Sequence, residues 1–357
     1  MAFAMLEFRL KRSKLAKAEA APVEEAVAPL AETIPSGPPP GPPGLTLADI
    51  IPLMDRIYLL EQQMLALTRE RMPDETLWRG QPPLITDAKP GTDVFPNGAA
   101  CREVHFRQPW FSFWTDRLGE TLRYHRKLWE FVFICQVLHE RGLLRTGSRG
   151  LGFGVGGEPL SAYFISRGCR ITATDMAPDE AEAAGWTLTA QHAAGIETLR
   201  RPNLCDDAVF DAGVEFLNVD MNHIPDDLTG YDFCWSACAF EHLGSIEHGL
   251  AFVEQSIKTL KPGGWAVHTT ELNLSSNLDT VAEGGTVLFR RRDMDELADR
   301  LRAAGHEVLP FDYDAGDGPV DRFVDIAPYR PEPHLKLALE GFATTSFGVI
   351  VRRGGGR

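Results

Sequence analysis

The apolar residues between positions 146 and 357 fall into short runs separated by segments of helical spacing. The runs predict strands at 151–155, 170–175, 214–219, 231–236, 265–271, 306–311 and 345–351. Helical spacing predicts one helix that begins near Glu158 and two more at 245–260 and 292–304. Strands that alternate with helices in this way predict a parallel sheet with helices on both faces, and therefore an α/β fold.

A different pattern occupies residues 46–72, where an amphipathic helix is predicted. Its apolar residues follow a 3-4-3-4-3 spacing and share one stripe: Ile50, Leu53, Ile57, Leu60, Met64 and Leu67. The stripe is shorter than the three to four heptads that define a secure coiled coil. Docking on the rest of the chain explains it as well as self-association does. We therefore expect residues 50–67 to form either an internal contact or a contact with a second copy or a partner.

The segments on either side of this helix have less regular patterns. Residues 1–45 carry basic residues among apolar ones and then a stretch rich in Ala, Glu and Pro, which predicts a disordered tail and a Pro-rich linker. Residues 73–145 begin as a loop and continue as an aromatic-rich helical cap with Phe106, Trp110, Phe111, Phe113 and Trp114. Such rings predict a lid over a bound acceptor, a helical cover on the edge of the sheet, or both at once.

Composition narrows the class of protein. A net charge of −14 and a pI near 5.2 argue against a nucleic-acid partner, because such proteins usually present a basic surface. The six cysteines form no CxxC pair, which favours reduced thiols in a cytosolic protein. No apolar run approaches the roughly 18 residues of a membrane span, and the first residues lack the apolar core of a signal peptide. We expect a cytoplasmic protein without stable membrane insertion.

Candidate chemistry gathers around the Gly-rich turn at residues 152–158. Glycines there allow backbone N–H groups and a helix N-terminus to approach a ligand closely. Asp175 ends the next strand, 19 residues after Gly156, where a carboxylate can accept hydrogen bonds from ribose hydroxyls. The turn, Asp175, Asp220 and the segment 236–242 all fall at the predicted carboxyl ends of parallel strands, which is where such sheets bind ligands.

The order of these features resembles the class I S-adenosylmethionine-dependent methyltransferases, especially the type 11 group that acts on small molecules and glycans. The matching features are the glycine turn, Asp175, Asp220-Met221, Glu241-His242-Leu243 and the segment 260–264. The resemblance covers about residues 147–352. It implies a Rossmann-like seven-stranded methyltransferase sheet with an antiparallel last strand, S-adenosyl-L-methionine as the cofactor, and a methyltransferase domain at 146–357 that follows an N-terminal helical extension.

The resemblance also implies the cofactor-binding residues. The methionine part of the cofactor would lie against Gly152, Gly154 and Gly156, and the ribose against Asp175. The adenine would lie against Asp220 and Met221, and the sulfonium above Ser236 and Ala237. The family commonly has an acidic residue where Gly152 stands and a glycine where Glu158 stands. Glu158 is therefore expected to supply the missing carboxylate to the α-amino group of the cofactor.

The catalytic residues follow from the chemistry of methyl transfer. An in-line displacement needs alignment, and a hydroxyl acceptor also needs a general base. His242 is the first candidate, because imidazole titrates near neutrality, and Glu241 is expected to position it. Both residues could instead shape the loop, and His125 and His268 are alternative bases. No metal is predicted. The Asp-rich segment 312–341 favours a solvated loop, with an acceptor-site insertion or a carboxylate metal site as alternatives.

Taken together, these features predict a methyltransferase that O-methylates a small molecule, sugar or glycan precursor. Two other functions stay open at this point. A nicotinamide-dependent oxidoreductase would share the doubly wound sheet but would lack the antiparallel last strand. A non-catalytic scaffold of a biosynthetic complex would keep the fold and contact its partners through residues 50–67.

Overall fold

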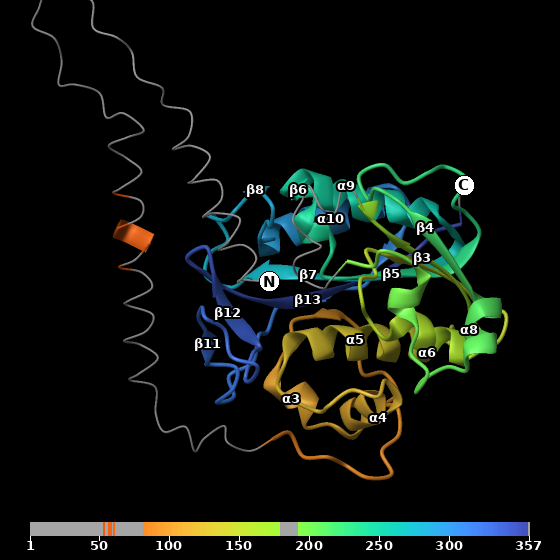
Figure 1. The fold of residues 1–357 in the computed structure, drawn as a ribbon. Coiled ribbons are helices and arrows are strands. Elements are labelled where there is room, and N and C mark those ends of the chain that lie inside the picture. Colours follow the sequence, from red (N-terminus) through yellow and green to blue (C-terminus); the bar gives the residue numbers. More distant parts are fainter. Residues whose placement is uncertain (1–52, 54–55, 59, 61–80, 179–191, 356–357) are drawn as a thin grey trace, which may run out of the picture. The chain divides into compact units, whose positions relative to one another are not determined.

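The computed structural model describes residues 53, 56–58, 60, 81–178 and 192–355 of the chain (Figure 1). The chain divides into two compact units, Met1–Arg71 and Met72–Arg357. In the first unit the described residues are helical, and Leu53, Ile57 and Leu60 are each more than half exposed. The predicted tail and linker and the rest of the apolar stripe lie outside the described residues. The short coiled coil therefore stays a prediction.

The second unit is built on a sheet of nine strands. Six of them lie in the order β4, β3, β2, β5, β7 and β13, with bounds Val214–Asn218, Arg170–Asp175, Arg149–Phe153, Tyr231–Ala237, Leu260–Asn273 and Phe342–Arg352. The first five strands are parallel, and β13 is antiparallel to β7. β9 (Glu307–Val308) pairs antiparallel with the other edge of β13. The predicted α/β fold is confirmed, including a last strand inserted antiparallel between its neighbours.

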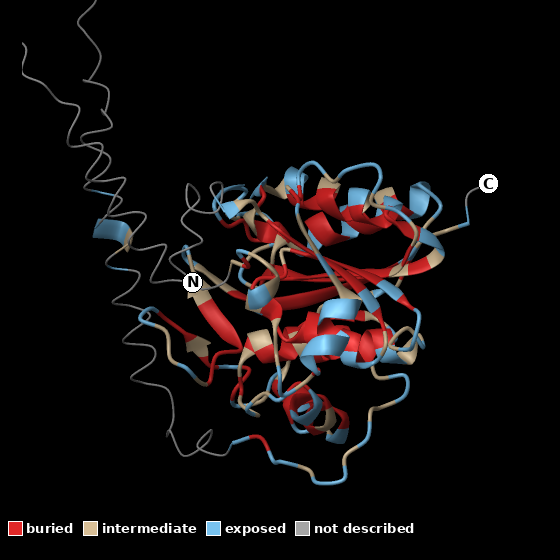
Figure 2. Cartoon of the chain, turned by 45° about the vertical axis from the view of Figure 1, so that its right-hand side comes forward, coloured by how far each residue is buried: buried red, intermediate tan, exposed pale blue. Residues whose placement is uncertain are grey.

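Helices cover both faces of this sheet. Figure 1 shows α9 (Ile246–Lys258) and α10 (Arg291–Ala303) on one face, and α5 (Arg126–Glu140), α6 (Leu160–Ser166) and α8 (Asp207–Gly213) on the other. The predicted N-cap Ser245 accepts a hydrogen bond from His248 N at 3.1 Å, which satisfies a first-turn amide of α9. Buried residues line the sheet and the inner helix faces in Figure 2, as amphipathic helices require.

The aromatic segment forms α3 (Glu103–Phe106) and α4 (Pro109–Arg117), which pack beneath α5. Four of its five rings are buried in one core with Trp129 and Phe133: Phe106, Trp110, Phe111 and Trp114. Trp114 Nε1 also donates a hydrogen bond to Gln136 Oε1 at 2.6 Å. The segment is thus a helical cover, as one of the two interpretations predicted, because its buried rings pack against α5.

The prediction of a solvated loop at 312–341 is wrong for part of this segment. The segment contributes β11 (Val324–Asp325) and β12 (Lys336–Leu339) to the sheet, beyond the seven predicted strands. Three of its charged residues, Asp321, Asp325 and Lys336, are buried because they pair internally. Asp321 accepts from Glu103 N at 2.8 Å and from Lys336 Nζ at 3.3 Å, and Asp325 contacts His334 Nδ1 at 2.8 Å. The free-energy cost of burying an Asp that has such partners is far lower than that of burying an unpaired Asp.

The remaining elements are short. The predicted strand 306–311 is split into β9 and β10 (Phe311–Asp312), because Pro310 between them has no N–H to donate. β10 pairs with β1 (Gly98–Ala99), and β6 (Gly244–Ser245) pairs with β8 (Glu283–Gly284). Two 3-10 helices cover Ile196–Leu199 and Phe240–His242, and the second carries two predicted catalytic residues.

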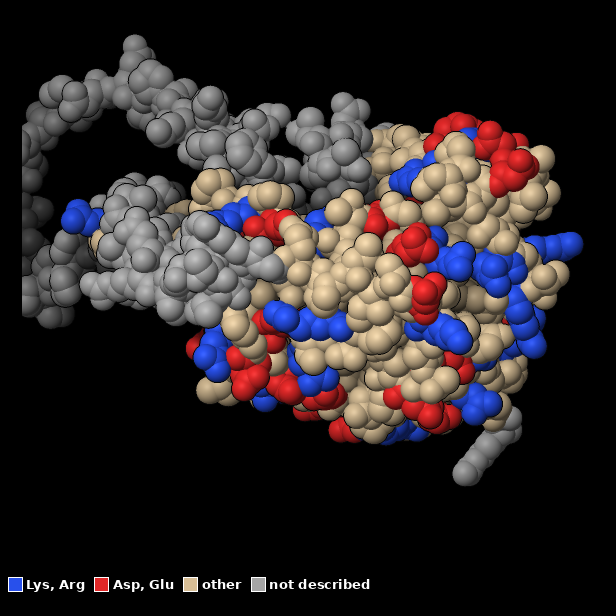
Figure 3. Space-filling model, turned by 90° about the horizontal axis from the view of Figure 1, so that it is seen from below, with Lys and Arg blue, Asp and Glu red and all other residues tan. Residues whose placement is uncertain are grey.

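Three further features concern the cysteines, the helices and the surface charge. All six cysteines are buried and none forms a disulfide, as predicted. Within the described ranges, no helix has the length and apolar character needed to cross a membrane. The face of the molecule in Figure 3 has Lys and Arg interspersed with Asp and Glu.

Candidate active site

The loops that follow β2, β4 and β5 meet at the carboxyl edge of the sheet. Gly154 and Gly156 in the first loop have φ angles of +57° and +51°. A Cβ atom on Gly154 would lie 2.9 Å from Ala239 Cβ and 3.2 Å from Met221 Sδ. Both the backbone conformation and this close approach require glycine. The structure therefore brings together the glycine turn, Met221 and the segment after β5.

Asp175 holds this edge together through its carboxylate. Oδ2 accepts from Gly156 N and from Ala193 N, each at 2.9 Å, and Oδ1 accepts from Met176 N at 2.8 Å. A carboxylate has about four acceptor positions, so one position on Oδ1 is left for a ligand hydroxyl. Asp175 thus orders the glycine turn and still fits a ribose diol through that single position.

Asp220 and Met221 follow β4 and differ in exposure. The Asp220 carboxylate accepts from Asn222 N at 2.8 Å and contacts His223 Nδ1 at 2.7 Å, while its side chain is 39% exposed. Met221 is buried, with its sulfur against Gly154. The pair offers one apolar side chain and one accessible carboxylate beside the glycine turn, which suits a heterocycle with polar edges.

The space that an acidic side chain would occupy at position 152 is filled by Trp235. A Cβ atom on Gly152 would lie 2.5 Å from Trp235 Cζ2 and 2.5 Å from Val155 Cγ1. The indole Nε1 of Trp235 donates to Glu158 Oε1 at 2.6 Å. Burial raises the pKa of Glu158 to about 8, against the lowering effect of this hydrogen bond. Glu158 therefore lies under the turn, directed at Trp235, and its expected contact with a cofactor amine stays a prediction.

Ser236 and Ala237 end β5 and contact the protein rather than open space. The Ser236 hydroxyl is hydrogen-bonded to His268 Nδ1 at 2.8 Å, and His268 Nε2 lies 3.0 Å from Ser256 Oγ. Both nitrogens of His268 are thus engaged between two serines. The carbonyl of Ala237 accepts from Lys127 Nζ at 3.2 Å, which brings an ammonium to this strand end.

Glu241 and His242 lie in the loop after β5 and face each other. His242 Nδ1 is 2.9 Å from the carbonyl of Gly285, which can only accept, so Nδ1 carries the proton of the neutral ring. His242 Nε2 lies 3.9 Å from Glu241 Oε1. Burial lowers the pKa of His242 to about 4. Burial, reinforced by the neighbouring Glu271 carboxylate, raises the pKa of Glu241 to about 8.

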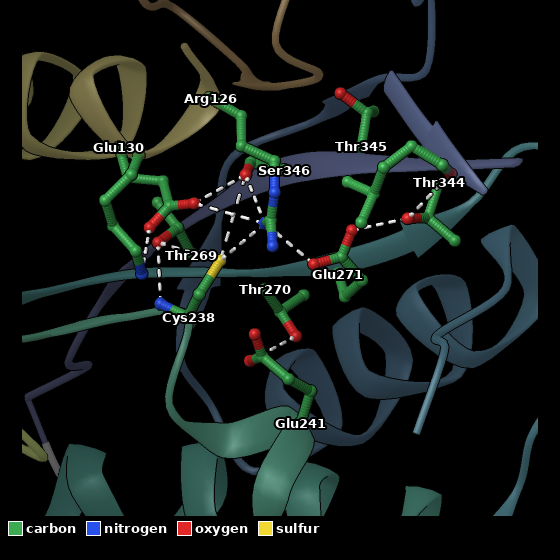
Figure 4. A network of polar contacts seen from close by, with 12 residues as sticks. Arg126, Glu130, Cys238, Glu241, Thr269, Thr270, Glu271, Thr344, Thr345 and Ser346 are labelled. Atoms are coloured by element: carbon green, nitrogen blue, oxygen red, sulfur yellow. Dashed lines mark hydrogen bonds and ion pairs between the residues drawn. The ribbon is translucent and has the colours of Figure 1, made fainter. Parts of the chain in front are cut away.

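A network of buried polar contacts surrounds this loop (Figure 4). Arg126 is at its centre and joins α5 to β7, β13 and the loop after β5. Its Nη1 atom lies 2.7 Å from Glu271 Oε2, 3.1 Å from Ser346 Oγ, 3.4 Å from Glu130 Oε1 and 3.8 Å from Cys238 Sγ. Burial acts to lower the pKa of Arg126, but Glu271 and its other anionic neighbours raise it above the usual value.

The charges of this network balance only when Glu241 is protonated. Arg126 and Lys127 are the two cations, and Lys127 Nζ lies 2.9 Å from Glu130 Oε2. Glu130 and Glu271 are the two matching anions. An ionised Glu241 would add a third buried negative charge near Glu271, and that charge is costly in a low-dielectric site. This arrangement explains the direction of the pKa shift of Glu241.

Three of these side chains are of metal-binding types. Ligand atoms of Cys238, Glu241 and Glu271 lie within 4.8 Å of one another, and all three residues are buried. Arg126 already provides a positive charge in contact with two of them. Cys238 also has a φ of +49°, which its amide supports by donating to Thr269 O and Thr269 Oγ1, each at 3.0 Å. The prediction of no metal stays a prediction.

The sequence reasoning did not assign Arg126, Glu130 or Glu271 to the site. One signal was available in the first turn of α5, which has two cations and no acidic residue. Cations are disfavoured at a helix N-terminus, so two of them there indicate buried anionic partners or a ligand. Of the alternative bases, His125 accepts from Lys127 N at 3.2 Å, and burial lowers its pKa to about 3.

Comparisons with known proteins identify one domain of the chain. Residues 151–268 match the family model described as a methyltransferase domain. No curated protein matches the chain in sequence. Similar solved structures include the 1,6-didemethyltoxoflavin-N1-methyltransferase of Burkholderia thailandensis, with 18% identity over 61% of this chain and 76% of that one and a TM-score of 0.34.

Two further solved structures are similar to the same extent. An S-adenosylmethionine-dependent methyltransferase of Aquifex aeolicus has 19% identity over 61% of this chain and 87% of that one, with a TM-score of 0.33. One of Clostridium acetobutylicum has 12% identity, 68% and 97% coverage and a TM-score of 0.36. The family model and the strand order together show that the chain contains a class I methyltransferase domain whose cofactor is S-adenosylmethionine.

Proposed function

We propose that this domain methylates a hydroxyl oxygen of a small molecule, sugar or glycan precursor, and that Glu241 takes the hydroxyl proton. The observation that carries the proposal is a buried carboxyl group with a pKa of about 8 in the loop after β5. A general base works best when its pKa lies near the operating pH. His242 Nε2 lies 3.9 Å from Glu241 Oε1, which is beyond hydrogen-bond distance. Thr270, whose Oγ1 donates to Glu241 Oε2 at 3.2 Å, is then the residue that orients Glu241.

The residues at the carboxyl edge suit the cofactor. Asp175 Oδ1 would accept from the ribose, Met221 and Asp220 would hold the adenine, and the backbone at Gly154 and Gly156 would lie along the methionine part. The cofactor supplies an electrophilic methyl group on a positively charged sulfur. Transfer forms a carbon–oxygen bond, breaks the carbon–sulfur bond and releases the hydroxyl proton to Glu241.

The acidic composition supports a small acceptor or a glycan over a nucleic acid. With a net charge of −14, the chain would repel a phosphate backbone at long range. The cytoplasm stays the expected compartment, on the sequence grounds given above.

Calorimetry with S-adenosylmethionine on the full chain tests the proposal. We expect binding by the wild type and loss of binding in Asp175→Ala, because this change removes the ribose acceptor and three hydrogen bonds to backbone amides. Asp226→Ala, in an exposed loop, is the matched control and should bind like the wild type. No binding by the wild type would overturn the proposal. Binding that is followed by no transfer to any hydroxyl compound would favour a scaffold protein.

A further inference from the structure

The guanidinium of Arg126 makes its polar contacts on one side only. Its described hydrogen bonds, to Glu130, Cys238 and Ser346, all leave from Nη1, and so does its closest ion pair, with Glu271. Nη2 and Nε donate no hydrogen bond to a described residue, although Arg126 is only 5% exposed. Figure 4 shows one guanidinium nitrogen without a dashed line, directed to the space between Cys238, Thr270 and Glu271.

An unused acceptor lies on the other side of that space. Glu241 Oε2 accepts from Thr270 Oγ1 at 3.2 Å, but Oε1 accepts no hydrogen bond from a described residue and is buried. Oxygen atoms of Glu241 and Glu271 and the sulfur of Cys238 lie within 4.8 Å of one another. Glu241 Oε1 is a fully buried acceptor without a partner, whereas the unused nitrogens of Arg126 keep some access to solvent. A buried acceptor without a partner is costly, so the site is suited to a ligand that donates to Glu241 and accepts from Arg126.

The combination of groups selects the chemistry of that ligand. A hydroxyl group donates to a carboxylate and accepts from a guanidinium at the same time. An ammonium group would face the positive charge of Arg126, and a carboxylate would face the negative charge of Glu271. Two neighbouring hydroxyls match the two unused guanidinium nitrogens and the two carboxyl groups best.

We infer that Arg126, Glu241 and Glu271 form a subsite for two neighbouring hydroxyl groups on a neutral acceptor, and that this subsite selects against amines and acids. The inference rests on the proposed function, because it places the acceptor beside the proton-accepting Glu241. It differs from a metal site on the same residues, because the guanidinium supplies the positive charge to which the hydroxyl oxygens would bind.

Ligand-observed NMR on the full chain without cofactor tests the subsite directly. One set of probes is methyl glucoside, glucosamine and glucuronate, and a second set is catechol, 2-aminophenol and salicylate. We expect the neutral diol of at least one set to bind at millimolar concentration and to exceed its charged analogues at least tenfold, the order expected when a buried charge is left without a partner. The two sets distinguish a sugar from a phenolic acceptor.

Two variants and a control complete the test. Glu241→Gln keeps the shape but replaces one carboxyl oxygen by an amide nitrogen that cannot accept a hydrogen bond. Arg126→Lys keeps the charge but loses the planar fork, and each variant should weaken diol binding about tenfold. Arg123→Gln is the control, since Arg123 contacts only Glu120 and Thr121. Thermal unfolding shows whether each variant is folded. If Arg126→Lys does not fold, Glu241→Gln alone decides the outcome.

Three results would overturn the inference: equal or better binding of the charged analogues, diol binding unchanged in a folded Glu241→Gln, and no diol binding in either set. None of them depends on the cofactor. A chain that fails to bind S-adenosylmethionine but binds the diols would therefore retain the subsite and lose the proposed function.

Discussion

Glu241 is the residue whose ionisation the proposed reaction depends on. The base must be ionised before it can take a proton, and burial raises its pKa to about 8. We therefore predict that kcat/KM rises with pH and levels off above an apparent pKa near 8. Glu241→Gln should remove this rise and lower kcat by roughly 10²–10⁴-fold, the usual contribution of a general base.

The control for this prediction is Glu247→Gln, because Glu247 pairs with Arg300 on the exposed side of α9. Initial rates between pH 6 and 9 with labelled methyl groups would measure the profile. A flat profile in the wild type, or a loss of less than about threefold in Glu241→Gln, would assign the proton to another group.

Glu158 carries a separate prediction about the cofactor. Its carboxyl group is held by Trp235 Nε1 directly below the glycine turn. Glu158→Gln should reduce the affinity for S-adenosylmethionine about tenfold, the order of one hydrogen bond to a charged group. Calorimetry would measure the affinity, and near-ultraviolet circular dichroism would show whether Trp235 has moved. Unchanged affinity would mean that Glu158 supports Trp235 and nothing more.

The site residues show which parts of the chemistry a sequence can reveal. The glycine turn and Asp175 could be predicted because they are close in sequence and their spacing reflects one β-α-β unit. Arg126, Glu130 and Glu271 could not, because the contacts that bring Arg126 to Glu271 and Glu130 to Ser346 join positions more than a hundred residues apart. Only the two unbalanced cations of α5 hinted at them.

At the scale of elements, the glycine turn is tied to the segment before β4. Arg201 Nη2 donates to Gly157 O, while its Nη1 donates to Thr198 O at 3.0 Å and to Arg200 O at 2.9 Å. Arg201 therefore fixes the turn in place before any ligand binds. We predict that Arg201→Gln raises KM for S-adenosylmethionine about fivefold with little change in kcat, because a preorganised loop mainly lowers the cost of binding.

The neighbouring Arg200 is a suitable control, because its described contacts are with the carboxylates of Glu197, Asp207 and Asp211 and with the ring of Phe210, away from the glycine turn. Steady-state kinetics of Arg201→Gln and Arg200→Gln with varied cofactor would separate the two residues. Equal KM values in both variants would show that the turn keeps its conformation without the Arg201 contact.

Helices and strands could be predicted where burial produced an apolar pattern in the sequence. They were missed where buried polar side chains form hydrogen bonds or ion pairs with one another. The four inner parallel strands, β3, β2, β5 and β7, appear as apolar runs because both of their faces are covered. β12 was missed because its first residue is Lys336, a buried cation paired with Asp321. The predicted helix at 50–67 still awaits a test of self-association.

At the scale of the whole molecule, buried titratable groups predict how stability depends on pH. Four histidines have a pKa lowered from 6.5 to about 3 or 4, and two glutamates have a pKa raised from 4.5 to about 8: His105, His125, His242, His268, Glu158 and Glu241. Below pH 6.5 the unfolded histidines bind protons that the folded ones do not, so stability falls as the pH falls. Above pH 6.5 the folded glutamates keep protons that the unfolded chain has released, so stability falls as the pH rises toward 8.

The free energy of unfolding should therefore be greatest near pH 6.5, and each glutamate should contribute a decline of up to about 1.4 kcal/mol per pH unit above it. Urea unfolding between pH 5 and 8 would measure the curve. Glu158→Gln should make the decline on the alkaline side shallower, while Glu247→Gln should leave it unchanged. Stability that rises between pH 6.5 and 8 would contradict the prediction.

The contact between Gly152 and Trp235 restricts the order in which this site could have evolved. A chain with an acidic side chain at position 152 would have no room for an indole at position 235, so a change of residue 152 to glycine would have to come first or with it. The indole N–H then needed a buried acceptor, which Glu158 provides. Reversion of Gly152 alone is now closed, because its new Cβ would lie 2.5 Å from the indole. A side chain at position 152 therefore requires a smaller residue at position 235 first.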